Sequence, residues 1–210
     1  MYPVNIDLKG KSCLVVGGGH VALRKIGTLL EEAAEVTVIA PELSREVKAL
    51  ADEGTIHWRK EIYKSGDAAD YFLVITCAGD REVAEAVHEE AEARGFLYNA
   101  ADFPKLGNCH IPARFTAEGL MVTVSTGGRS PALAKYFKNR FKNEIPPGFS
   151  AWMDRVEVIR GEMKECLEGG AARENFWREV LNDRVMDLVG QGKIDEAEEC
   201  VRHGIGRFRA

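Results

Sequence analysis

The sequence has no long apolar segment that would mark a membrane protein. A membrane-spanning helix needs about 20 consecutive apolar residues, and no run of that length occurs in the 210 residues. The amino-terminal stretch MYPVNIDLKGK also lacks the basic start and apolar core of a signal peptide. We therefore expect a protein that neither crosses a membrane nor is exported.

Regularly spaced cysteines and an excess of basic charge are also missing. The five cysteines are widely spaced and form no CxxC pair, which indicates neither disulfides nor a zinc knuckle and favours the reducing cytoplasm. The net charge of -5 is opposite in sign to the basic footprint of nucleic-acid binding. With 7 prolines and 45% hydrophobic residues, the chain is expected to be globular rather than disordered.

The first hundred residues alternate between strand-like and helix-like patterns. Such alternation implies crossover connections and a mainly parallel sheet. The strand patterns lie at Ser12–Val16, Glu35–Ala40, Ile56–Arg59, Tyr71–Thr76 and Phe96–Asn99, and the helical patterns lie at His20–Ala33, Leu43–Asp52 and Arg81–Arg94.

The pattern changes after this region. Two alternating runs around Glu118-Gly119 predict an antiparallel hairpin, and Ser130-Pro131 is typical of a helix start. We predict an α/β fold with a Rossmann-like, mainly parallel sheet over residues 1–108, a hairpin and helix for dimerisation or substrate binding over 109–146, and a helical domain over 147–210. The helices expected in the last domain are Ala151–Leu167, Ala171–Val189 and Ile194–His203.

A glycine-rich turn follows the first predicted strand. Gly17 permits a sharp turn, Gly19 lets the backbone approach a pyrophosphate, and the small Ala22 allows the helix to pack near the strand. The helix N-terminus then offers unpaired N–H groups and partial positive charge to the anion. This context predicts a dinucleotide site, the alternative being a glycine turn without a ligand.

The end of the second strand bears on which dinucleotide is bound. An acid there usually holds the adenosine ribose, and here Glu42 either takes that role or is a solvated charge at a helix start. No arginine follows the strand to bind a 2′-phosphate, which favours NAD over NADP.

Three segments occur in an order that points to a family. YPVNIDLKGKSCLVVGGGHVALRK, NAADFP and VTVSTGGRSPALAK together resemble the precorrin-2 dehydrogenase family. The resemblance implies an oxidoreductase of sirohaem and porphyrin biosynthesis that converts precorrin-2 to sirohydrochlorin with NAD and acts as a homodimer. The multifunctional members carry a further methyltransferase, which this chain lacks, so a single-purpose version is implied.

The resemblance also assigns roles to individual residues. It implies a catalytic role for Asp102, which follows Ala100 and Ala101, and a place near the tetrapyrrole pocket for Ser125. The cofactor contacts that it implies are His20, Val21, Pro41 and Glu42.

Asp102 has a plausible chemistry of its own. It lies just beyond a predicted parallel strand, where open α/β sheets place their ligands. A carboxylate there would accept the proton lost as hydride leaves for nicotinamide. The alternative is a turn residue, because Asp-x-Pro commonly starts a turn.

A polar turn and a basic helix form the candidate substrate site. The turn residues Ser125, Gly127, Gly128 and Arg129 precede a helix N-terminus, and such a turn either binds an anion or only caps the helix. A basic helix suits a polycarboxylate such as precorrin-2. Five basic and no acidic residues occur from Arg129 to Lys142, namely Arg129, Lys135, Lys138, Arg140 and Lys142.

Two further functions remain open on the sequence. A ferrochelatase for sirohydrochlorin, alone or as a second activity, would share Asp102. Cys109 and His110 supply no metal site by themselves, because adjacent strand residues point to opposite faces. A dinucleotide-sensing module without catalysis would leave the STGGRSPALAK segment unexplained.

Overall fold

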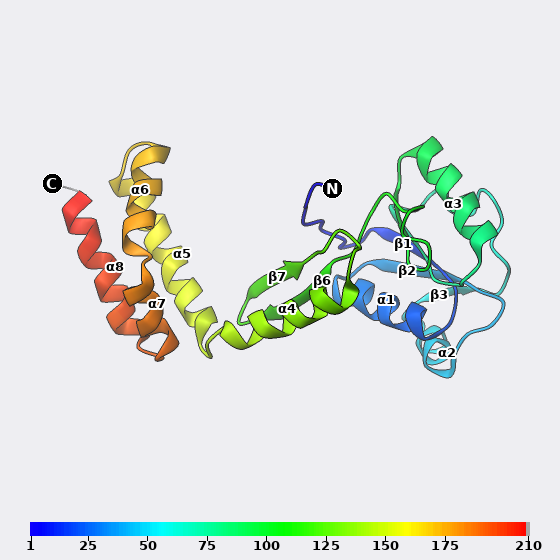
Figure 1. Ribbon diagram of the computed structural model, residues 1–210, viewed down its shortest axis with the longest axis horizontal. Coiled ribbons are helices and arrows are strands. Elements are labelled where there is room, and N and C mark those ends of the chain that lie inside the picture. The colour runs from blue at the N-terminus through cyan, green and yellow to red at the C-terminus, as the bar shows by residue number, and fades with distance from the viewer. Residues whose placement is uncertain (209–210) are drawn as a thin grey trace. The chain divides into compact units, whose positions relative to one another are not determined.

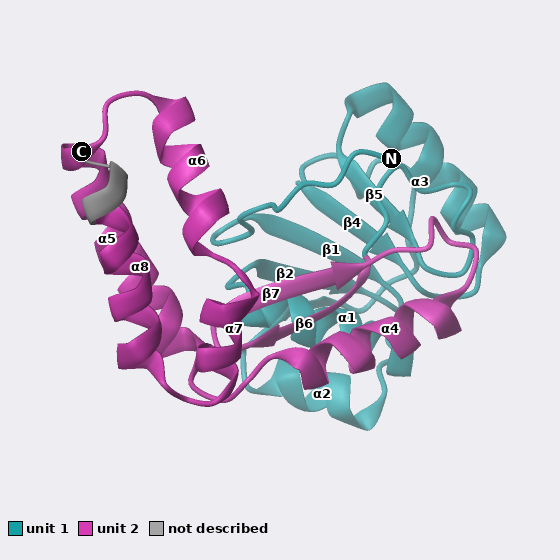
Figure 2. Ribbon diagram, turned by 60° about the vertical axis from the view of Figure 1, so that its left-hand side comes forward, with its two compact units in different colours: residues 1–111 teal, residues 112–210 magenta. Residues whose placement is uncertain are grey.

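The computed structural model describes residues 1–208, which form two compact units. Figure 1 labels the helices and strands, and Figure 2 colours the units. The first unit is Met1–Ile111 and the second is Pro112–Ala210. The predicted division into residues 1–108, 109–146 and 147–210 stays a prediction.

The first unit is built on a five-stranded parallel sheet in the order β3-β2-β1-β4-β5. Because β1 lies between β2 and β4, the chain changes direction across the sheet at β1. Val16, the last residue of β1, is level with Ile39 and Thr76, the last residues of its neighbours. The strands are β1 Ser12–Val16, β2 Glu35–Ile39, β3 His57–Arg59, β4 Leu73–Thr76 and β5 Leu97–Ala100, which confirms the predicted parallel sheet.

Helices cover both faces of this sheet. Helices α1 (His20–Glu31) and α2 (Arg45–Asp52) bury apolar residues with Val15 and Val38, whereas α3 (Arg81–Arg94) packs with the alternate residues Leu14 and Val74. This segregation follows from the strand period, since successive side chains point to opposite faces. Because all five strands are parallel, the loops that follow them meet at one edge of the sheet.

The second unit begins with the predicted hairpin and helix. Strands β6 (Ala113–Ala117) and β7 (Leu120–Val124) pair antiparallel. Glu118 and Gly119 have φ of 51° and 78°, the left-handed geometry of a two-residue hairpin turn. Helix α4 runs from Pro131 to Glu144, and the hydroxyl of Ser130 accepts a hydrogen bond from the Leu133 amide, as expected of an N-cap.

Up to Phe208, four helices complete the unit, and here one prediction was wrong. The segment expected as one helix over Ala171–Val189 forms two, because Asn182 accepts a hydrogen bond from the Val185 amide and caps a new helix. The last helix also extends beyond His203, to Phe208. The helices are α5 Phe149–Cys166, α6 Gly170–Val180, α7 Asp183–Gly190 and α8 Ile194–Phe208.

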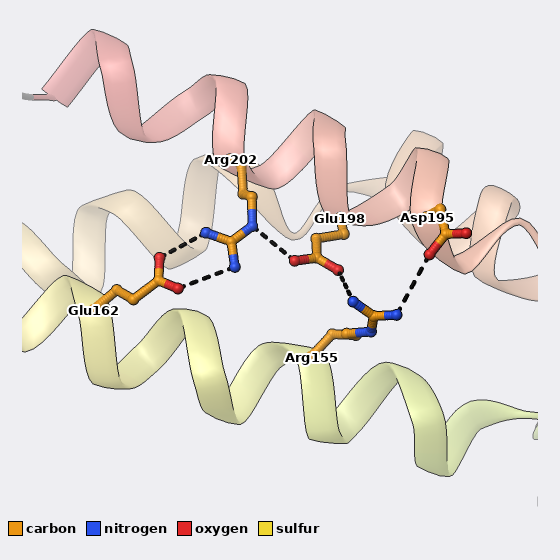
Figure 3. Close-up of polar contacts among 5 residues, drawn as sticks. All are labelled: Arg155, Glu162, Asp195, Glu198 and Arg202. Atoms are coloured by element: carbon orange, nitrogen blue, oxygen red, sulfur yellow. Dashed lines mark hydrogen bonds and ion pairs between the residues drawn. The ribbon is translucent and has the colours of Figure 1, made fainter.

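A chain of ion pairs joins α5 to α8 beside the apolar core of these helices (Figure 3). The guanidinium of Arg202 contacts Glu162 at 2.6 Å and Glu198 at 2.7 Å, and Arg155 donates to Glu198 at 2.8 Å and to Asp195 at 3.5 Å. Glu198, shared by both arginines, is only 13% exposed. A shared, partly buried acid fixes the register of the two helices better than isolated surface pairs do.

Candidate dinucleotide site

Gly17 is a glycine because the turn after β1 touches the turn after β4. Its φ is 121°, and a Cβ there would lie 2.9 Å from the carbonyl oxygen of Cys77. The Gly17 amide donates to the Ile39 carbonyl at 2.9 Å, which ties the turn to β2 as well. The glycine turn thus lies where the chain changes direction across the sheet, the usual ligand crevice of open α/β sheets.

Gly18 is a residue that the sequence reasoning passed over. A Cβ at this position would lie 2.3 Å from the carbonyl oxygen of Glu42 and 2.7 Å from a methyl carbon of Leu43. The Ser44 amide also donates to the Gly18 carbonyl at 2.8 Å. Gly18 therefore holds the loop after β2 against the turn, and the run of three glycines was the available sequence signal.

Gly19 differs from its neighbours because nothing surrounds the position of a Cβ within 4 Å. It is the N-cap of α1, no side chain caps the helix, and the first turn carries no acidic residue. The first amides of a helix have no intrahelical partner, so this end offers donors and partial positive charge to an anion. His20 and Val21 are exposed at this end, while Ala22 is fully buried against the sheet.

Pro41 and Glu42 lie at the carboxyl end of β2, on the same edge of the sheet as the glycine turn. Both residues are exposed, and the Glu42 backbone abuts Gly18. This is the position from which an acid reaches an adenosine ribose. The roles of Pro41 and Glu42 stay predictions.

Asp102 lies on this edge too, beyond the end of β5. The Ala101 amide donates to the Thr76 carbonyl at 2.9 Å, and a carboxylate oxygen of Asp102 accepts from the Gly79 amide at 2.9 Å. The side chain is otherwise exposed. The candidate base and the glycine turn thus both adjoin the turn after β4, while a catalytic role for Asp102 stays a prediction.

Three polar groups near this edge were not singled out from the sequence. Burial raises the pKa of the Cys77 thiol to about 12, and the nearby Asp102 carboxylate adds to the effect. Burial also lowers the pKa of Lys25, whose amine donates to the Asn99 side-chain oxygen at 3.3 Å. Asn99 is 8% exposed although it is polar, and an amide inside a strand pattern was the signal for it.

The candidate substrate turn belongs to the second unit. Gly127 and Gly128 have φ of 62° and 79°, which explains the paired glycines. The Ser125 hydroxyl accepts from the Gly127 amide at 3.2 Å. Arg129 is exposed, and its guanidinium donates to the Thr126 carbonyl at 3.2 Å. The turn is ordered by its own hydrogen bonds, and its role as a ligand site stays a prediction.

Helix α4 combines the expected basic residues with a second, apolar set. Its only buried residue is Ala134, while the side chains of the apolar set are 39–58% exposed. Their spacing places them on one side of the helix. The exposed apolar residues of α4 are Leu133, Tyr136, Phe137 and Phe141.

Cys109 and His110, the pair weighed as metal ligands, both lie in the first unit. Cys109 packs against the core of the first unit, and a His110 ring nitrogen lies 3.2 Å from the Pro104 carbonyl oxygen. Within residues 1–208, no group of three or more His, Cys, Asp or Glu is arranged to hold a metal ion. None of the helices described in that range is both long and apolar enough to cross a membrane.

Comparison with known proteins agrees with this geometry. Residues 4–113 match the family described as putative NAD(P)-binding, and residues 148–205 match the sirohaem synthase dimerisation region. The siroheme synthase of Methylococcus capsulatus is 35% identical over 95% of this chain and 42% of its own length, and that of Nitrosococcus oceani is 34% identical over 93% and 42%. The chain thus spans less than half the length of these relatives.

A solved structure matches nearly the whole chain. The protein titled "SirC, precorrin-2 dehydrogenase" superposes with a TM-score of 0.71 at 28% identity, over 95% of this chain and 99% of that one. The expected Rossmann-like fold with an added hairpin and helices is thereby confirmed. The chain belongs to the putative NAD(P)-binding family, and it is similar to sirohaem synthases, whose dimerisation region it also matches, and to a precorrin-2 dehydrogenase.

Proposed function

We propose that this protein oxidises precorrin-2 to sirohydrochlorin with NAD as the hydride acceptor. The observation that carries the proposal is the edge of the first unit's sheet, where an uncapped helix N-terminus and an exposed carboxylate adjoin the same turn. The similarity to a precorrin-2 dehydrogenase across nearly the whole chain selects this reaction among those that such an edge supports.

The first unit's residues supply binding and proton acceptance. The turn Gly17–Gly19 and the first amides of α1 would hold the pyrophosphate, and Glu42 would accept hydrogen bonds from the adenosine ribose. Bound NAD supplies the acceptor for the hydride. Asp102 would take the proton that leaves the macrocycle with that hydride, so that precorrin-2 and NAD⁺ give sirohydrochlorin, NADH and a proton.

The second unit would contribute to substrate binding and to assembly. The turn Ser125–Arg129 and the basic side chains of α4 suit the carboxylates of a tetrapyrrole. The exposed apolar side of α4, next in sequence to a dimerisation region, favours a homodimer. Five widely spaced cysteines without a CxxC pair suit the reducing cytoplasm as the location.

The decisive experiment follows NADH absorbance with enzymatically generated precorrin-2. Wild-type protein should produce NADH, and Asp102→Ala should lose turnover while it keeps its affinity for NAD. Binding of NAD without any turnover of precorrin-2 would remove the dehydrogenase and leave the sensing module. Addition of ferrous iron to sirohydrochlorin, without NAD, tests the alternative ferrochelatase by comparison with the uncatalysed rate.

A further inference from the structure

The segment that carries Asp102 is a closed loop on the edge of the sheet. The chain leaves β5 at Ala101 and returns at Gly107, where a Cβ would lie 2.9 Å from the Tyr98 carbonyl oxygen. The Cys109 amide then donates to that same carbonyl at 2.9 Å. The loop between these points therefore has its two ends fixed against one strand.

Two asparagine side chains join the two ends of this loop by hydrogen bonds. The Asn108 side chain accepts from the Tyr98 amide at 2.8 Å and donates to the Phe96 carbonyl at 3.0 Å. On the other side, the Asn99 side-chain nitrogen donates to the Cys109 carbonyl at 2.8 Å. Because that bond uses the amide nitrogen, the Asn99 oxygen remains available as an acceptor.

The Lys25 side chain donates a hydrogen bond to this oxygen. Its amine comes from α1, 74 positions away in the sequence, and lies 3.3 Å from the Asn99 oxygen. Lys25 lies about 1.7 turns after Gly19 on α1, so the helix that offers its N-terminus to the cofactor also holds the loop of the candidate base. Lys25, Asn99 and the Cys109 carbonyl form one continuous hydrogen-bonded link.

We propose that Lys25 and Asn99 are positioning residues, which hold the Asp102 loop at a set distance from the cofactor helix. This proposal rests on the proposed function, because it assigns them to the dehydrogenation step. Among the described residues, Asp102 accepts a single hydrogen bond, from the Gly79 amide, so the loop beneath it must set where the carboxylate lies. A displacement of about 1 Å in a reacting group costs about 100-fold in rate.

The test compares Lys25→Met and Asn99→Leu with Arg24→Met as a matched control. Methionine keeps the alkyl stem of Lys25 and removes the donor, and Arg24 is an exposed neighbour on the same helix. We expect the first two variants to lose at least tenfold in kcat, with KM for NAD within twofold of wild type. Arg24→Met should keep wild-type kcat, and thermal unfolding of all three should show a folded protein.

Two further readouts separate positioning from general damage. In an Asp102→Ala background, Lys25→Met should change the residual rate less than twofold, since it acts through the missing carboxylate. Amide hydrogen exchange at Gly79 and Cys109 should become at least tenfold faster in Lys25→Met, while the amides of β1 stay protected.

The outcomes distinguish this proposal from the proposed function. Unchanged exchange at Gly79 and Cys109, or an equal loss of rate with and without Asp102, would overturn the positioning role. If wild-type protein fails to oxidise precorrin-2, the proposed function falls. The exchange data then decide whether the link still orders the loop, with faster exchange supporting it and unchanged exchange refuting it.

Discussion

Two adjacent glycines, Gly18 and Gly19, should respond in opposite ways to the same substitution. A methyl group at Gly18 would lie 2.3 Å from a backbone oxygen of Glu42, which is fixed by its place between β2 and α2. The Leu43 methyl can rotate away, but the Glu42 carbonyl is backbone and moves only with the loop between β2 and α2. A methyl group at Gly19 meets nothing within 4 Å.

These surroundings set the size of each effect. Overpacking against a rigid neighbour costs about 1–3 kcal/mol, so Gly18→Ala should lower the free energy of unfolding by that amount. For a chain of this size, each 1 kcal/mol corresponds to about 2–4 °C in Tm. Gly19 has φ of -91° and ψ of -167°, which alanine adopts without strain, so only the weaker capping of alanine remains, about 0.5–1 kcal/mol.

The affinity for NAD, unlike the stability, should be affected mainly by the substitution at Gly19. The space beside Gly19 is where a pyrophosphate would approach, so Gly19→Ala should weaken NAD binding at least tenfold while Tm stays close to wild type. Calorimetric titration with NAD and thermal unfolding of the same samples provide both numbers. Wild-type NAD affinity in Gly19→Ala, or wild-type Tm in Gly18→Ala, would refute this account of the turn.

Three other perturbations test contacts away from the turn. Tyr63→Phe removes the 2.6 Å hydrogen bond that the Tyr63 hydroxyl donates to the buried Glu90, whose other carboxylate oxygen has no partner among the described residues. The free energy of unfolding, measured in urea, should fall by about 1–3 kcal/mol. A fall below about 0.5 kcal/mol would contradict this. Burial alone would raise the pKa of Asp67, but its hydrogen bonds, with Arg59 foremost, outweigh burial and lower it. The ionised carboxylate therefore stabilises the fold at neutral pH, and Asp67→Asn should lose about 1–3 kcal/mol at pH 7. The loss should shrink as the pH falls below the ordinary aspartate value of 3.8, because wild type gives up this contribution as the carboxylate is protonated through its lowered pKa. A loss that does not change as the pH falls would count against the ion pair. Phe137→Glu places a charge in the exposed apolar side of α4 and should turn a dimer into monomers in analytical ultracentrifugation, whereas an unchanged mass would place the interface elsewhere.

Local patterns were sufficient for most of the elements. The strand at Ser12–Val16, the helix at Arg81–Arg94 and the hairpin around Glu118-Gly119 lie where the sequence predicts them. Each depends on periodicity, a cap or a turn residue within a few positions, which is information that a single segment contains. The segment Ala171–Val189 was misread because an asparagine inside a helical pattern does not reveal whether its side chain will compete for a backbone amide.

In the candidate site too, some features could be predicted from the sequence and others could not. The glycine turn, the acid after the second strand and Asp102 are recognisable from residue type and from their place after a strand, so the sequence by itself determined the edge at which a dinucleotide would bind. Only the tertiary structure decided that Gly18 is needed for the approach of the Glu42 backbone, and that Lys25 reaches Asn99. The physical reason is that both contacts join segments distant in the sequence, and their distances depend on how helices and strands pack rather than on any local propensity.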